Sequence, residues 1–98
     1  MTIRHTVNFR LNHPAGSDEE RDFLTTGGDT LSAIPGVHDF RILRQVSAKS
    51  DLDFQFSMVF VDQAAYNAYD AHPDHVGFVQ SRWVPEVAQF QEYDYTEL

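Results

Sequence analysis

The chain of 98 residues contains no cysteine, which excludes a disulfide framework and a thiolate site. Basic residues are few and scattered: seven Lys and Arg stand against 15 Asp and Glu, and the formal net charge is −8. Because phosphate backbones are bound by clustered Lys and Arg, we expect neither nucleic acid nor an anionic membrane as a partner.

Long apolar runs are also absent, since no stretch approaches the roughly 20 residues needed to span a bilayer. The first residues alternate in polarity and lack the continuous apolar core of a signal peptide. We therefore expect a cytoplasmic protein. The apolar fraction of 42%, with eight Phe, four Tyr and one Trp, favours a packed fold, and the length predicts a single domain over residues 1–98.

Four segments have the pattern of β-strands: residues 3–11, 37–46, 54–61 and 88–95. In the first segment, His5 shares one face with four apolar residues. The third segment has apolar residues on both faces, which predicts a central strand or one that is covered twice.

Two helical regions separate these strands. The first begins at Ser17, which can form a capping box with Glu20, and the pair Gly27-Gly28 predicts a kink or a split in it. The second begins at Asp62 and breaks at His72-Pro73, where the proline opens a further helix.

The order strand, helix, strand, strand, helix, strand predicts an α+β, ferredoxin-like fold, a four-stranded antiparallel sheet with helices on one face. The apolar outer side of the third strand would leave an exposed patch that soluble monomers rarely tolerate. Two such sheets packed face to face would cover it and enclose a small barrel. We therefore predict a homodimer, a dimeric α+β barrel.

Three stretches, "IRHTVNFRL", "YDAHPDHVGFV" and "FQEYDY", resemble the stress-responsive A/B barrel domain (Dabb) over residues 3–95. The most specific part is Tyr-x-x-His-Pro-x-His-x-x-Phe, which is met by Tyr69, His72, Pro73, His75 and Phe78. The resemblance implies a dimeric α+β barrel with a link to stress response.

One branch of that family, the plant olivetolic acid cyclases, closes a linear polyketide by aldol condensation without a metal or cofactor. The resemblance implies that Tyr69 and His75 carry the chemistry here, that His5 lines the pocket and that Asp94 orients His75. The cyclases have a further pocket histidine on the third strand, where "FQFSMVF" has none.

The residues themselves are compatible with that chemistry. His75 lies near a helix start, where the dipole favours a neutral imidazole that could accept a proton from a carbon acid. Asp94 could hold the other ring nitrogen, and Tyr69 could donate a hydrogen bond to a carbonyl as charge develops. The alternative is that His75 and Asp94 form only a structural hydrogen bond that ties the helix to the sheet.

His5 lies on the apolar face of its strand, which suits either a pocket wall or a core residue. His72 could border the pocket but suits a cap at the junction, and Phe78 suits either the pocket or the core. Since His72 and His75 offer only two nitrogens, we expect no metal site. The sequence has no glycine-rich phosphate loop, and we expect no cofactor.

The leading hypothesis is thus a dimer that binds a small apolar or aromatic carbonyl compound in the pocket of its half-barrel, with cofactor-independent cyclase, lyase or isomerase chemistry if it is an enzyme. One alternative is a non-catalytic, stress-associated dimer whose interior is filled by side chains. The other is a cofactor-independent, monooxygenase-like activity.

Overall fold

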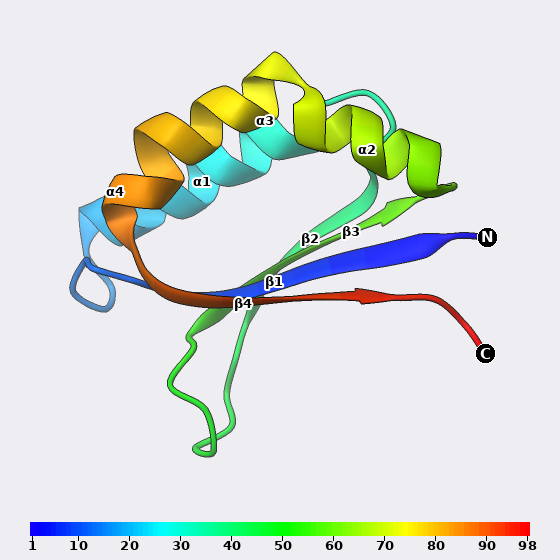
Figure 1. Cartoon of the computed structure of the whole chain (residues 1–98). Helices are drawn as coiled ribbons and strands as arrows, with labels where there is room; N and C mark the ends of the chain where they lie inside the picture. The colour runs from blue at the N-terminus through cyan, green and yellow to red at the C-terminus, as the bar shows by residue number, and fades with distance from the viewer.

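In the computed structural model, which describes residues 1–98, four antiparallel strands form one sheet and the helices cover one of its faces (Figure 1). The strands are β1 (Ile3–Leu11), β2 (His38–Arg44), β3 (Phe54–Phe60) and β4 (Val87–Tyr95), and they lie in the order β2-β3-β1-β4. This arrangement confirms the predicted ferredoxin-like fold. It also confirms the central position of the third strand, because β3 pairs with both β1 and β2.

The helical elements are α1 (Asp18–Ser32), α2 (Gln63–Ala71), α3 (Pro73–Phe78), η1 (Val79–Trp83) and α4 (Val84–Glu86). The last three follow one another without a break, and η1 is a single π-helical stretch between two α-helical ones. Such stretches are rare and frequently lie at functional sites. No helix combines the length and the apolar character needed to cross a membrane.

Side chains cap the helices where the sequence predicted. The Ser17 hydroxyl accepts the N–H of Glu20 at 3.2 Å, and the Glu20 carboxylate reaches back to the N–H of Gly16 at 3.0 Å. Asp62 caps α2, and the Nδ1 atom of His72 accepts a backbone N–H in the first turn of α3. The chain therefore breaks at His72 and restarts at once, as its proline requires.

The split that the glycine pair could have produced is not present, because α1 is continuous across Gly27 and Gly28. A Cβ atom on Gly27 would lie 2.9 Å from Cζ of Phe56 and 3.1 Å from Cζ of Phe78. A Cβ atom on Gly28 would lie 2.8 Å from Cδ1 of Ile42. The two glycines thus let α1 approach the sheet closely.

The core lies between the sheet and the helices and is dominated by aromatic rings. Phe9 and Phe56 are completely buried, and their ring centroids lie 4.8 Å apart across β1 and β3. Phe23 of α1 packs its ring on both. This cluster of rings sets the distance between the helices and the sheet.

The opposite face of the sheet is mixed in polarity, which corrects the expectation that β3 is apolar on both sides. In the register of β1 and β3, Thr6 lies opposite Ser57 and Asn8 lies opposite Gln55 on this outer face. Apolar side chains are exposed toward its edges, among them Leu43 of β2 and Tyr93 of β4. We call this face of the sheet, which the helices do not cover, the open face.

Candidate functional site

A cavity of about 470 Å³ opens between the helix-covered face of the sheet and the segment from α2 to α4. Its walls are largely apolar, and the polar groups that line it come from His5, Tyr69, His75 and Glu92. Phe56 and Met58 of β3 also line it from the helix-covered face of the sheet.

Tyr69 reaches the cavity from α2, and only 2% of the residue is exposed. Its ring centroid lies 4.5 Å from that of His75 and 6.3 Å from that of His5, so the phenol lies near both imidazoles. The Tyr69 hydroxyl has no hydrogen-bond partner in the protein. Every fully buried side-chain nitrogen and oxygen does have such a partner, so this hydroxyl is not fully buried. The hydroxyl therefore faces the open space of the cavity.

The Tyr69 hydroxyl stays protonated over a wide pH range. Burial raises the pKa of Tyr69 well above its ordinary value, and the negative charges of Asp70 and Glu92 raise it further. A phenol in this state donates a hydrogen bond and does not act as a base. The donor role predicted for Tyr69 requires this protonated state.

The second polar group, His5, is held by two neighbours. Its Nδ1 atom lies 2.6 Å from Oδ1 of Asp94 and 2.8 Å from the hydroxyl oxygen of Tyr66. Because an ionised carboxylate only accepts, Nδ1 carries the proton and Nε2 is left as the unprotonated nitrogen. Nε2 has no protein partner and, by the same argument as for Tyr69, faces the cavity.

Tyr66 completes this group. Burial, and after it the hydrogen bond with Asp94, raises the pKa of Tyr66 far above its ordinary value. The phenol therefore remains a neutral donor beside the carboxylate. Nothing in the sequence singled out Tyr66 for this role, because its partner lies 28 positions further along the chain.

The predicted contact between Asp94 and His75 is not present. The pairing of β1 with β4 places Asp94 directly opposite His5, and the carboxylate bonds to that ring instead. The Nδ1 atom of His75 lies 3.0 Å from the carbonyl oxygen of Asp70, near the end of α2. That carbonyl lacks a helical partner because α2 ends before Pro73, so it accepts the imidazole N–H.

His75 therefore also presents an unprotonated Nε2, and it lines the cavity next to Tyr69. Phe78, which was expected at the pocket or in the core, does both: it is 5% exposed and lines the cavity. His72 does not line the cavity, because its ring is turned to the N–H of Asp74 as a cap.

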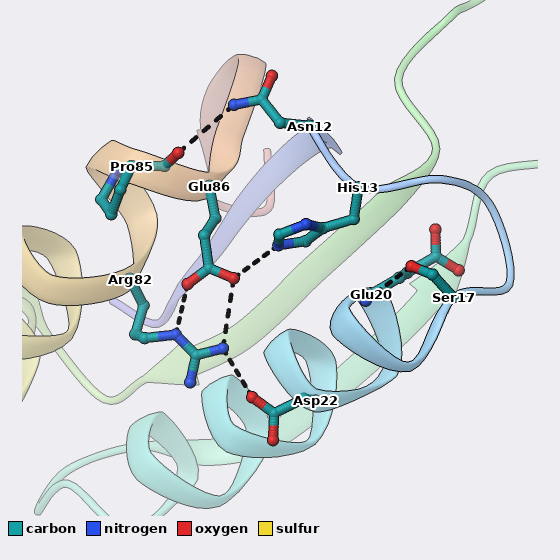
Figure 2. A network of polar contacts seen from close by, with 8 residues as sticks. All are labelled: Asn12, His13, Ser17, Glu20, Asp22, Arg82, Pro85 and Glu86. Carbon is teal, nitrogen blue, oxygen red and sulfur yellow. Dashed lines mark hydrogen bonds and ion pairs between the residues drawn. The ribbon is translucent and has the colours of Figure 1, made fainter.

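A polar clasp, formed by His13, Asp22, Arg82 and Glu86, holds the π-helical wall of the cavity in place (Figure 2). Arg82 donates two hydrogen bonds to the Glu86 carboxylate and a third, at 2.8 Å, to Asp22 of α1. His13 of the β1–α1 loop bonds to the same carboxylate at 2.7 Å. The hydrogen bonds from Arg82 are the main cause that lowers the pKa of Glu86.

Phe90 and Glu92 of β4 also line the cavity, and neither was predicted from the sequence. Both could have been predicted from the alternation of side chains along a strand, because they alternate with Asp94 on β4 and so share its face. Trp83 lines the cavity from η1. No group of three or more His, Asp and Glu side chains is arranged to hold a metal ion.

Comparison with known proteins places this geometry in a wider context. The family model described as the Stress responsive A/B Barrel Domain matches residues 3–97. A crystal structure of a dabb family protein with a ferredoxin-like fold from Mesorhizobium loti is 57% identical, with a TM-score of 0.98, over 99% of this chain and 97% of that one. No curated protein sequence matches.

More distant structures share the fold. A dimeric ferredoxin-like protein of unknown function from Thermobifida fusca is 23% identical, with a TM-score of 0.82, over 99% of this chain and 92% of that one. A hydroxynitrile lyase from Passiflora edulis is 13% identical, with a TM-score of 0.84, over 99% of this chain and 94% of that one. At these identities the likeness concerns the fold alone.

Proposed function

We propose that this chain, which belongs to the stress responsive A/B barrel domain family, binds a small apolar or aromatic carbonyl compound and transfers a proton on it. One observation carries the proposal. A single apolar cavity brings together a phenol that stays protonated, Tyr69, and two imidazoles, His5 and His75, that each present an unprotonated nitrogen.

The size and walls of the cavity support the binding half of the proposal. Its volume of about 470 Å³ falls in the range of ordinary small-molecule sites, roughly 300–1,000 Å³. Rings of Phe78, Trp83 and Phe90 line it and would pack on an aromatic or aliphatic ligand. The few polar groups would fix the orientation of that ligand.

The polar groups support proton chemistry at a carbon next to a carbonyl. The Tyr69 hydroxyl would donate to the carbonyl oxygen, and Nε2 of His75 would accept a proton from the adjacent carbon. The C–H bond breaks, its electron pair moves into the enolate, and the charge on oxygen is stabilised by the Tyr69 hydrogen bond. His75 becomes an imidazolium whose Nδ1–H stays on the Asp70 carbonyl.

The fate of the enolate decides the reaction class. Return of the proton to another carbon gives isomerisation, and attack of the enolate on a second carbonyl in the same molecule gives cyclisation. The ring of Tyr69 lies nearer to the ring of His75 than to the ring of His5, and we therefore assign the proton-accepting role to His75. The Asp94–His5 pair would be the second acid–base group of the cavity. Lyase chemistry, the activity in the name of a protein with the same fold, would be a further member of this class.

Exchange of acetyl protons tests the chemistry directly. In heavy water, the acetyl methyl signal of para-methylacetophenone in proton NMR should disappear faster with the protein than in buffer alone. His75→Ala and Tyr69→Phe should each slow the exchange by at least about tenfold, since each removes one arm of the acid–base pair. His38→Ala is the matched control and should exchange like the wild type, because His38 lies outside the cavity.

The same assay separates the alternatives. If the compound binds but its protons exchange no faster than in buffer, the proton chemistry is refuted and the non-catalytic alternative is supported. Product analysis under oxygen and under argon identifies a monooxygenase-like reaction, which would require oxygen.

We also propose that the chain is a homodimer joined through the open face. Leu43, Tyr93 and Tyr95 are each about half exposed there or at its edge, and a partner sheet would cover them. The description of the Thermobifida fusca protein as dimeric supports this assembly. Sedimentation equilibrium tests this proposal, because it measures the mass of the assembly in solution.

A further inference from the structure

We propose that the cavity selects its ligand by charge: it accepts uncharged or amine-bearing carbonyl compounds and rejects carboxylates, and Glu92 is the residue that makes this distinction. The inference rests on the proposed function, because it names the class of compound that the same cavity takes.

The first support is the sign of the charge at the cavity. Glu92 is the one Asp, Glu, Lys or Arg among the residues that line it, and it is exposed on β4, where a ligand entering from solvent would meet it. Its carboxylate is close enough to raise the pKa of Tyr69 from the opposite wall. A second carboxylate, Asp94, lies behind His5, 2.6 Å from its Nδ1 atom.

The second support is the absence of any cation that could offset these charges. None of the seven Lys and Arg side chains lines the cavity, and five of the arginines form ion pairs with Asp or Glu. Arg82 is next to Trp83 in sequence, but its guanidinium is bound to Asp22 and Glu86 in the clasp. A ligand carboxylate would therefore lose its hydration shell and find no opposite charge in return.

The third support is the aromatic wall beside Glu92. The rings of Trp83 and Phe90 meet edge to face with centroids 5.6 Å apart, and both line the cavity. Aromatic faces carry negative potential, so they attract an ammonium group and disfavour a carboxylate. The walls and Glu92 thus act in the same direction.

A series of three ketones of similar size isolates the effect of charge. The probes are para-methylacetophenone, which is neutral, para-acetylbenzylamine, which is a cation at neutral pH, and para-acetylbenzoate, which is an anion. Trp83 is the only tryptophan in the chain and lines the cavity, so its fluorescence reports binding of each. We expect the amine to bind at least as tightly as the neutral ketone, and the carboxylate to bind about tenfold more weakly.

Two variants locate the cause. Glu92→Gln should bring the affinity for the carboxylate to within about threefold of that for the neutral ketone, and should weaken binding of the amine relative to the neutral ketone. Glu19→Gln makes the same chemical change on α1, away from the cavity, and should leave all three affinities as in the wild type.

The outcomes are distinct. Equal affinity of the wild type for the carboxylate and the neutral ketone overturns the charge selection and leaves the proposed binding function standing. A penalty that Glu92→Gln does not relieve, or that Glu19→Gln relieves equally, overturns the assignment to Glu92. Failure of all three probes to bind refutes the proposed function and the selection with it.

Discussion

Replacing Gly27 with alanine tests how closely α1 must approach the wall of the cavity. The new Cβ atom would lie 2.9 Å from Cζ of Phe56, which real Cβ contacts essentially never show, and 3.1 Å from Cζ of Phe78, which is tighter than most of them. Phe56 is completely buried, and its ring already packs against those of Phe9 and Phe40. The helix must therefore move off the sheet or push both rings toward the cavity.

Gly28→Ala is the matched control on the same helix. Its Cβ atom would meet only the tip of Ile42, a flexible side chain that is 41% exposed and can swing into solvent. Each substitution gains roughly 1 kcal/mol of helix propensity, so this gain cancels when the two variants are compared. Overpacking a filled core costs about 1–3 kcal/mol, and only Gly27→Ala incurs it. We therefore expect Gly27→Ala to be less stable than Gly28→Ala by about 1–3 kcal/mol.

Urea unfolding followed by circular dichroism measures this difference. Similar slopes with denaturant in both variants would show that the native and unfolded states keep their compactness. Because Phe56 and Phe78 line the cavity, Gly27→Ala should also weaken binding of para-methylacetophenone, whereas Gly28→Ala should not. If Gly27→Ala proves as stable as Gly28→Ala, the close approach of α1 to these rings is not as described.

Three further predictions concern the clasp, the imidazoles and the open face. The pKa of Glu86 is lowered from its ordinary value of 4.5 by the hydrogen bonds from Arg82, so its stabilising effect is full above that value and is lost as the pH falls through the lower folded-state pKa. Glu86→Gln should therefore be less stable than the wild type by about 1–3 kcal/mol at pH 7 and should approach it in strong acid; equal stability at pH 7 would count against the clasp. Nitrogen chemical shifts should place the proton of both His5 and His75 on Nδ1, and an Nε2–H form of either ring would contradict its hydrogen-bond assignment. Leu43→Lys should turn the dimer into a monomer in sedimentation equilibrium by placing a charge on the open face, and an unchanged mass would move the interface elsewhere.

The fold could be predicted from the sequence because it depends on local periodicity. The alternation of residues 3–11 and the break at His72-Pro73 are properties of neighbouring residues, and the structure keeps both. The caps at Ser17 and Asp62 follow from the same local chemistry.

The contacts of the site could be predicted only in part, because they depend on tertiary packing. Asp94 bonds to His5 rather than His75 because the pairing of β1 with β4 sets which side chains face each other, and a single sequence does not state that pairing. The same holds for Gly27, whose role depends on Phe56 of a different strand. Glu92 could have been predicted from the sequence, because the alternation of side chains along β4 places it on the same face as Asp94.

A crystal structure of the protein with para-methylacetophenone tests the central claim most directly. The account predicts that the compound lies in the cavity, with its carbonyl oxygen about 2.7 Å from the Tyr69 hydroxyl oxygen and its acetyl carbon facing Nε2 of His75. A compound bound on the open face, or a cavity closed by side chains with no ligand beside Tyr69, would contradict it.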